Sequence, residues 1–253
     1  MRKMYTITQV PAKWLLLSSL IVVVNTGVPV SVSAQGLSLD QSRIIFTAGQ
    51  PHRVVTADND SGTLYLIQAD VRETAPDGAV SEQWFVTPPL FRLSPHSRQS
   101  VKILPQKGTD QLPADRESLF YFSATALPSI PGPASEAGPA ARISLGTRLV
   151  IKMFYRPGDL PVTYEQAAAG VTFTRSSGTL CISNPSPYYL TFSELTSEGH
   201  HLTFPPGFML APFSRAPVKI SLTLNQIHWR TLNDYGGNTP RFQSTVREGG
   251  EKC

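Results

Sequence analysis

Short hydrophobic segments, each followed by turn-forming residues, recur along most of the chain. Many alternate apolar and polar positions, which is the two-residue period of a half-buried β-strand. Beyond residue 34 no long segment has the 3.6-residue period of an amphipathic helix. The pattern predicts strands over residues 42–46, 52–56, 64–71, 84–87, 91–93, 99–104, 119–124 and 143–155, and a second set from about residue 171. Short strands at regular spacing are typical of antiparallel sandwiches, so we predict an all-β protein.

Two interruptions of this pattern bear on the domain organisation. Residues 127–142 are rich in Pro, Gly, Ala and Ser, which supply few ladder donors and bury little, so they predict a hairpin connection or, alternatively, a domain linker. The long strand after them ends at Arg156-Pro157-Gly158, where Pro and Gly break pairing. We therefore place the boundary near Pro157, with a first domain over residues 35–157 and a second over 158–253.

The first 34 residues differ in kind from the rest. Arg2, Lys3 and Lys13 precede an apolar run over residues 14–24, and Val32-Ser33-Ala34 offers small residues of the kind that a signal peptidase accepts. The run is shorter than the about 20 residues of a membrane span. We predict a cleaved secretory signal over residues 1–34, with a retained anchor as the alternative, and no stable membrane insertion of the mature chain.

Composition narrows the class of protein. Hydrophobic residues make up 41% and charged residues 16% of the 253 residues, with 22 Pro and 18 Gly. These values argue against disorder and against a helix bundle. The net charge of +4 comes without a Lys/Arg block, so we expect no nucleic-acid partner.

No motif in the sequence indicates catalysis, a cofactor or a metal. Gly-x-Ser-x-Gly and His-Glu-x-x-His are absent from the sequence, and neighbouring His200 and His201 point to opposite faces of a strand. In an exported protein Cys181 and Cys253 could form a disulfide. Equally, Cys181 could be a small buried residue and Cys253 a mobile terminal one, so both alternatives stay open.

Several short runs carry a family resemblance: residues 39–46 (LDQSRIIF), 112–122 (LPADRESLFYF), 151–157 (IKMFYRP), 184–189 (NPSPYY) and 233–237 (NDYGG). In this order they resemble the periplasmic chaperones of the chaperone–usher pathway, closest to the type that serves P pili. The resemblance covers almost all of the mature chain. It implies two immunoglobulin-like β-sandwiches in an L-shaped arrangement, no cofactor and no enzymatic activity.

The resemblance also implies roles for particular residues. Arg43 and Lys152 would anchor the C-terminal carboxylate of a pilus subunit, since a carboxylate taken into a cleft needs charge-assisted donors. Ile143, Leu145 and Thr147, on one face of the strand before Lys152, would belong to the strand lent to a subunit. Thr147 stands where a larger apolar residue is usual, which puts one anchor in doubt.

A third group concerns the arrangement of the domains. Glu117, Arg156 and Asp234 correspond to an interdomain ion network in the family, which would fix domain geometry even where its net stabilisation is small. The implied partners are pilus subunits and an outer-membrane usher. Exposed Ile143 and Leu145 also make a self-capping dimer plausible.

Other classes of protein remain as alternatives. A two-domain adhesin or carbohydrate-binding module would share the fold, because sandwiches host many functions. It would carry aromatic residues on one face or loop tip, yet the chain has three Trp, one of them in the leader. A pilus subunit would lack its own final strand, and a hydrolase would need a catalytic triad.

Overall fold

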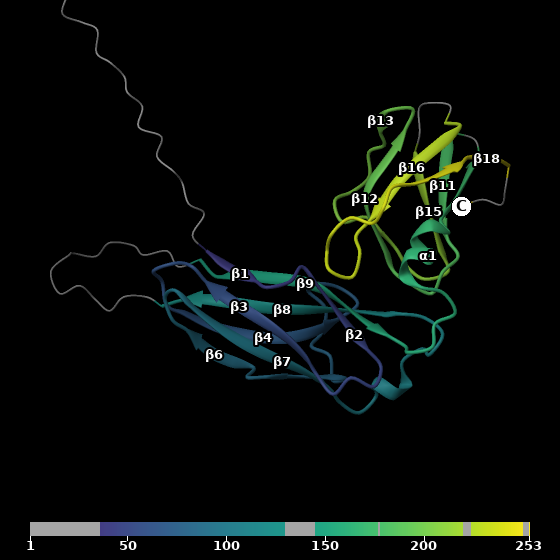
Figure 1. Cartoon of the computed structure of the whole chain (residues 1–253). Coiled ribbons are helices and arrows are strands. Elements are labelled where there is room, and N and C mark those ends of the chain that lie inside the picture. Colours follow the sequence, from purple (N-terminus) through teal and green to yellow (C-terminus); the bar gives the residue numbers. More distant parts are fainter. Residues whose placement is uncertain (1–35, 130–144, 177, 220–223, 250–252) are drawn as a thin grey trace, which may run out of the picture. The chain divides into compact units, whose positions relative to one another are not determined.

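The computed structural model describes residues 36–129, 145–176, 178–219, 224–249 and 253. The predicted signal, residues 1–34, lies outside the described residues, as do Ile143 and most of the predicted connection over 127–142. The described chain contains two β-sandwiches (Figure 1), each with its own hydrophobic core. The predicted all-β class with two sandwiches is confirmed, whereas the L-shaped arrangement stays a prediction.

The first sandwich is built from two sheets. A four-stranded sheet has the order β1-β3-β7-β5, and a five-stranded sheet has the order β2-β9-β8-β4-β6. Their facing sides enclose the core, in which the ring of Trp84 lies 4.7 Å from Phe46 and 5.5 Å from Phe120. The elements are β1 (Leu37–Leu39), β2 (Arg43–Thr47), β3 (Arg53–Asn59), β4 (Tyr65–Glu73), β5 (Trp84–Thr87), β6 (Leu90–Leu93), β7 (Ser97–Pro105), η1 (Thr109–Gln111), β8 (Ser118–Pro128) and β9 (Thr147–Arg156).

The second sandwich follows the same plan with shorter strands. One sheet has the order β15-β11-β10-β18, and the other has the order β13-β12-β16-β17, with β14 pairing β12. Trp229 is buried at the centre of this core, 4.9 Å from the ring of Phe173. The elements are α1 (Tyr164–Ala169), β10 (Thr172–Ser176), β11 (Thr179–Asn184), β12 (Leu190–Ser197), β13 (His200–His201), β14 (Met209–Leu210), β15 (Ser214–Lys219), β16 (Gln226–Thr231), β17 (Phe242–Thr245) and β18 (Arg247–Glu248).

The short helix α1 was not predicted. It begins with a capping box, in which the Thr163 hydroxyl accepts from the Gln166 amide and the Gln166 side chain accepts from the Thr163 amide. Thr-x-x-Gln is a recognisable start signal, but six residues are too few to show a hydrophobic period. Among the described residues, no helix has the length and apolar character needed to cross a bilayer.

The strand predicted over residues 143–155 begins later than expected. Leu145 and Gly146 precede β9, which starts at Thr147 opposite Ala126. Continuing that register would place Leu145 opposite Pro128, which has no N–H to donate to the ladder. The prediction that Leu145 lies in a regular strand is therefore wrong for the chain on its own.

A buried asparagine organises the same kind of loop in both sandwiches. The Asn59 side-chain amide donates to the carbonyls of Thr63 and Ser94 at 2.7 and 2.8 Å, and its oxygen accepts from the amide and hydroxyl of Ser61. Asn59 is fully buried.

Asn184 makes the matching set of bonds in the second sandwich. It donates to the carbonyls of Tyr188 and Ala211 at 2.7 and 2.8 Å and accepts from the amide and hydroxyl of Ser186. Each asparagine thus ties its own loop to a second chain segment, and its side chain uses both N–H donors and its oxygen. We refer to these two clusters as the Asn59 knot and the Asn184 knot.

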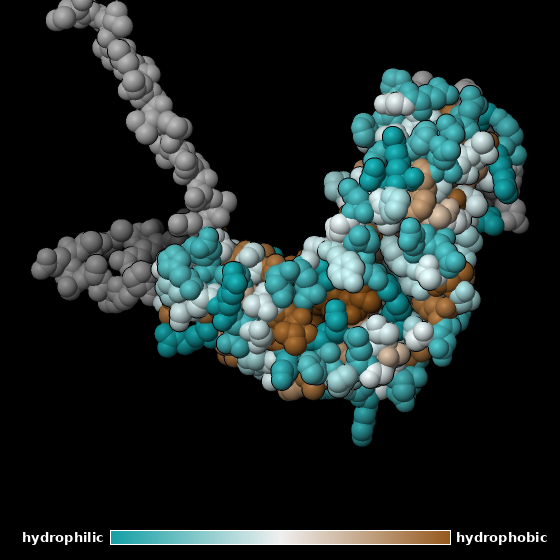
Figure 2. Space-filling model, in the orientation of Figure 1, coloured by the Kyte–Doolittle hydropathy of each residue, from teal (hydrophilic) through white to brown (hydrophobic). Residues whose placement is uncertain are grey.

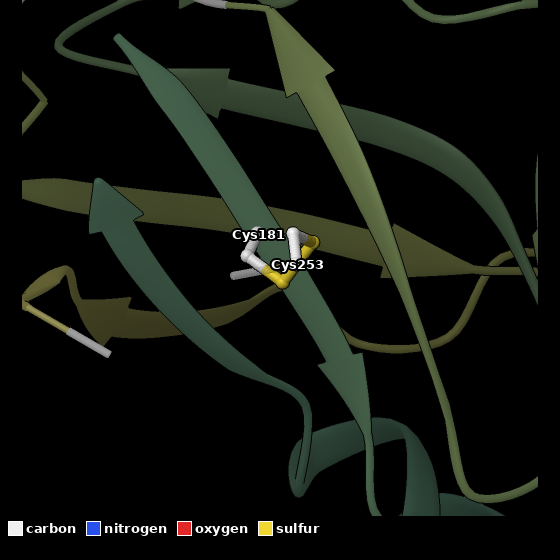
Figure 3. The surroundings of a disulfide bond; sticks show 2 residues. All are labelled: Cys181 and Cys253. Atoms are coloured by element: carbon white, nitrogen blue, oxygen red, sulfur yellow. A yellow bond between two sulfur atoms is a disulfide. The ribbon is translucent and has the colours of Figure 1, made fainter. Parts of the chain in front are cut away.

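The C-terminal segment is tied into the second sandwich. β18 pairs in parallel with β10, and Cys253 forms a disulfide with Cys181 of β11 across a separation of 72 residues (Figure 3). Of the two alternatives left open by the sequence, the structure contains the bonded one.

Candidate functional site

Two basic residues come together because β2 and β9 pair in parallel. The register places Arg43 directly beside Lys152, and Ile44 beside Met153. Ile44 and Met153 are fully buried in the core, so Arg43 and Lys152 project from the opposite face of the five-stranded sheet. Two residues 109 positions apart in the sequence thereby form one cationic site.

Arg43 is buried, and one of its donor nitrogens has no partner among the described residues. Only 6% of the residue is exposed, and its Nη1 donates to the Leu232 carbonyl at 3.1 Å. Its Nε is buried without a hydrogen-bond partner. Burial lowers the pKa of Arg43, although nearby Asp234 and Glu117 act in the opposite direction. A buried guanidinium N–H without an acceptor carries a cost in free energy.

Lys152 is half-buried beside Arg43. Its Nζ donates to the Gly207 carbonyl at 3.3 Å. Burial, followed by repulsion from the Arg43 charge, lowers the pKa of Lys152. Within the described part of the chain neither cation forms an ion pair within 4.0 Å, so a carboxylate at this position would relieve the repulsion and accept from both.

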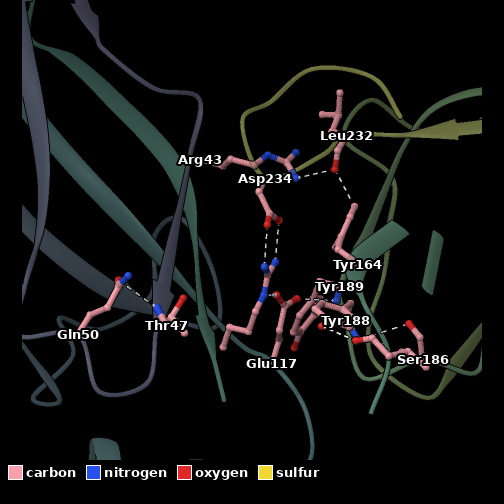
Figure 4. A network of polar contacts seen from close by, with 12 residues as sticks. Arg43, Thr47, Gln50, Glu117, Tyr164, Ser186, Tyr188, Tyr189, Leu232 and Asp234 are labelled. Carbon is pink, nitrogen blue, oxygen red and sulfur yellow. Dashed lines mark hydrogen bonds and ion pairs between the residues drawn. The ribbon is translucent and has the colours of Figure 1, made fainter. Parts of the chain in front are cut away.

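An ion network lies close to this pair (Figure 4). Arg156 donates its Nε to Glu117 Oε1 at 2.8 Å and both terminal nitrogens to Asp234 at 2.7 Å. The other oxygen of Glu117 accepts from the Tyr189 amide at 2.8 Å. Glu117 and Arg156 belong to the first sandwich, and Tyr189 and Asp234 belong to the second. The three predicted residues are therefore in direct contact and link the sandwiches.

Burial sets the electrostatics of this network. It raises the pKa of Glu117, and the positive charge of Arg156 opposes that shift. Burial also disfavours the charge on Arg156, but its bonds to Asp234 and Glu117 outweigh that effect and raise its pKa. The guanidinium also lies 5.0 Å from the centre of the Tyr188 ring. Removing Arg156 would leave the buried Glu117 carboxylate without its charged partner.

The sequence did not single out Tyr164 and Leu232 as site residues. The Tyr164 hydroxyl donates to the Leu232 carbonyl at 2.7 Å, the same oxygen that accepts from Arg43. Leu232 acts through its backbone, which any residue type could supply, so no signal in the sequence identifies it. Tyr164 stands just before the Glu165-Gln166 of the capping box and carried no separate signal.

Among the described residues, the first half of β9 has a neighbouring strand on one side only, and we call its other side the free edge of β9. Over residues 147–151 the strand pairs with β8, and its pairing with β2 begins only at Lys152. Leu145, ahead of this edge, is 78% exposed, and Thr147 is exposed. Leu149 and Ile151 lie partly buried against the core. Figure 2 shows hydrophobic surface on the first sandwich in the region of β8 and β9. An unpaired strand edge beside apolar surface is a template for another strand.

Comparison with known proteins assigns both sandwiches to one family. Residues 36–161 match the N-terminal domain model described as "Pili and flagellar-assembly chaperone, PapD N-terminal domain", and residues 166–243 match "Pili assembly chaperone PapD, C-terminal domain". Chaperone protein FimC of Escherichia coli K12 is 35% identical over 215 residues, which cover 83% of this chain and 85% of FimC. The chain belongs to the pili-assembly chaperone family.

Solved structures of this family share the fold. The SafB chaperone, seen in complex with the SafA pilin of Salmonella enterica, superposes with a TM-score of 0.72 at 25% identity, covering 84% of this chain and 97% of that one. The periplasmic chaperone SfaE gives a TM-score of 0.67 at 29% identity, covering 84% of this chain and all of SfaE. Members of the family are chaperones and not enzymes, which decides against the hydrolase alternative and the adhesin alternative.

Proposed function

We propose that this chaperone binds pilus subunits in the periplasm by pairing the free edge of β9 with an incomplete subunit while Arg43 and Lys152 hold the subunit's C-terminal carboxylate. The single observation that carries the proposal is the in-register pair of cations without a carboxylate partner at the end of an unpaired strand edge. A subunit strand added to that edge would run alongside β9 and bring its end to the cations. Backbone bonds would give affinity, and the carboxylate would set the register.

The side chains beside the edge suit such a partner. Leu145, Thr147, Leu149 and Ile151 alternate along one face of the chain, so a subunit groove could take them at every second residue. Burying the exposed Leu145 would contribute about 1.5–3 kcal/mol, and the already partly buried Leu149 and Ile151 would contribute less. Leu145, now outside the ladder, would join a ladder when a subunit strand pairs with the other side of the chain.

The ion network has a separate role in this proposal. Glu117, Arg156 and Asp234 would hold the two sandwiches so that the second one supplies the Leu232 and Gly207 carbonyls next to the cations. They would act as structural residues and would not touch the subunit. Export through a cleaved signal at residues 1–34 and delivery of the subunit to an outer-membrane usher complete the proposed function. In the absence of a subunit, two copies of the free chaperone would pair through the same edge and cover it.

The carboxylate anchor is tested by co-expressing the chaperone in the periplasm with the pilus subunit encoded beside it, followed by affinity capture. We expect the natural chain to recover soluble subunit, and Arg43→Ala and Lys152→Ala to lose it, because each variant removes charged donors from the carboxylate. Lys102→Ala is the matched control, since Lys102 is an exposed lysine on the four-stranded sheet of the same sandwich. Capture that survives both anchor substitutions would contradict the proposal.

The lent edge is tested separately by Leu145→Glu. Because Leu145 is 78% exposed, we expect an unchanged unfolding midpoint but subunit binding weakened about 10- to 100-fold, as a buried aliphatic contact is lost. The control is Leu90→Glu, which changes an exposed leucine on β6, at the opposite edge of the same sheet. Equal binding by the two variants would argue against the edge of β9 as the binding strand.

A further inference from the structure

One backbone carbonyl beside the cationic pair accepts two hydrogen bonds. The Leu232 oxygen accepts from Arg43 Nη1 at 3.1 Å and from the Tyr164 hydroxyl at 2.7 Å, as Figure 4 shows. A carbonyl oxygen has two lone pairs, so these two donors use its full accepting capacity. The direction of the carbonyl is therefore defined by both side chains together.

The rest of the Leu232 peptide is also fixed. Its amide donates to the Thr191 carbonyl at 2.9 Å. The turn that follows is closed by Asn233, whose side-chain oxygen accepts from the amides of Tyr235 and Gly237 at 3.0 Å each. A backbone hydrogen bond to Thr191 thus fixes the Leu232 amide, and the Tyr164 hydroxyl fixes the Leu232 carbonyl that accepts from Arg43.

Tyr164 is itself held in place by α1. It is the first residue of the helix, directly after the capping residue Thr163, and its ring packs edge-on against Tyr188 at 5.6 Å. Burial raises the pKa of Tyr164 to about 12, so its hydroxyl remains a donor at neutral pH. A rigid donor is therefore present whatever binds to Arg43.

We propose that Tyr164 is a positioning residue for the carboxylate anchor, acting on Arg43 through the Leu232 carbonyl. With this carbonyl fixed, Nη1 of Arg43 is committed to it, and the orientation of the guanidinium toward an incoming carboxylate is thereby set. Tyr164 does not touch the carboxylate. The inference rests on the proposed function, because it assigns a role in holding the subunit's C-terminus.

The test uses a synthetic peptide that copies the C-terminal strand of the pilus subunit encoded beside the chaperone, prepared as the free acid and as the carboxamide. The full chaperone is titrated with both by calorimetry. In Tyr164→Phe we expect affinity for the acid to fall about 2- to 10-fold, the size of one hydrogen bond, while affinity for the amide stays unchanged. In an Arg43→Ala background the same substitution should have no further effect on the acid, because the two residues act as one unit.

Tyr188→Phe is the matched control. It also removes a hydroxyl that donates to a backbone carbonyl, that of Val162 at 2.8 Å, but it does not reach Arg43. We expect it to leave the preference for the acid unchanged. If Tyr164→Phe keeps the full preference, or weakens acid and amide equally, the positioning role is overturned. If the natural chaperone binds acid and amide equally, the carboxylate anchor itself fails, and the role of Tyr164 fails with it.

Discussion

The two sandwiches use the same internal device but leave their last strands in different states. The Asn59 knot and the Asn184 knot share four bonds, with donor distances of 2.7 and 2.8 Å in each, and Asn59 adds a longer contact to the Leu93 carbonyl. In the second sandwich the terminal strand β18 pairs with β10, and Cys253 is bonded to Cys181. In the first sandwich, residues 147–151 of the last strand pair on one side only.

This difference separates a domain whose last segment is held by a disulfide from one whose last strand we propose is lent to a subunit. Both sandwiches satisfy their buried polar groups at the knots, so internal packing does not distinguish them. What distinguishes them is that a disulfide ties the C-terminal segment to the second sandwich, whereas the first sandwich contains no cysteine to hold its last strand. An open edge is ordinarily an aggregation hazard, and a chaperone is one setting in which such an edge has a use.

The largest effect on the free energy of unfolding should come from removing the disulfide of the second sandwich. The double substitution Cys181→Ser and Cys253→Ser removes a crosslink across 72 residues, and the chain-entropy estimate for that loop is about 4 kcal/mol. Trp84 lies in the first core and Trp229 in the second. Replacing Trp84 by Phe leaves the fluorescence of Trp229 to report the second sandwich, and replacing Trp229 by Phe leaves Trp84 to report the first. We expect denaturant unfolding at Trp229 to shift, with little change at Trp84. A shift of equal size at both would show that the disulfide does not stabilise the second domain alone.

The next prediction tests whether the knots are equivalent. Asn59→Ala and Asn184→Ala each leave several buried groups without partners, which should cost about 3 kcal/mol in the free energy of unfolding of the affected sandwich. Trp84 should report the first variant and Trp229 the second. Asn238→Ala, at an exposed asparagine, serves as the control. A cost below about 1 kcal/mol at one site only would show that the knots differ in spite of their matching geometry.

The sequence predicted the existence of the strands better than the residues at which they begin and end. Alternation located most strands of the first sandwich because each strand has one buried face, as Ile44 and Phe46 show in β2. It placed Leu145 in a strand because alternation carries no information about the partner strand, where Pro128 ends the ladder. The Asn59 and Asn184 knots escaped notice because Asn-x-Ser is too short a pattern to indicate a repeat.

Prediction of the candidate site depended on the family resemblance. No local pattern pairs Arg43 with Lys152, since their contact arises from parallel pairing of strands far apart in the sequence. Glu117, Arg156 and Asp234 were likewise named by resemblance, and the structure brings them into contact. The Leu232 carbonyl could not be predicted, because every residue type has a backbone carbonyl and the sequence does not show which one accepts.

A smaller effect is expected on the stability of the free chaperone, because the charge of Lys152 is partly buried beside Arg43. Burial and the adjacent Arg43 lower the pKa of Lys152, so the unfolded chain binds the proton more strongly than the folded chain does. Lys152→Met should therefore stabilise the free chaperone at neutral pH, by at most about 1 kcal/mol because Lys152 is partly exposed. The gain should shrink as the pH rises from the lowered folded pKa to the ordinary value of 10.5.

Thermal unfolding of both proteins across this pH range measures the difference. Met keeps the length of the side chain and removes its charge, so packing changes little. An advantage that stays constant up to pH 11 would show that packing, and not the charge, is responsible. A loss of stability at neutral pH would show that the Lys152 bond to the Gly207 carbonyl outweighs the burial of its charge.

The smallest expected effect compares edge strands of the two sandwiches directly. Thr147 lies on the free edge of β9, and Thr245 lies on the edge strand β17; both threonines are exposed. Thr147→Ile adds apolar surface to the strand proposed to enter a subunit, so subunit affinity should rise about 3- to 10-fold with unfolding of the free chaperone almost unchanged. Thr245→Ile should leave affinity as it was, because the second sandwich lends no strand. If both variants bind subunit more tightly, nonspecific hydrophobic contact explains the gain, and if neither does, the subunit groove does not reach Thr147.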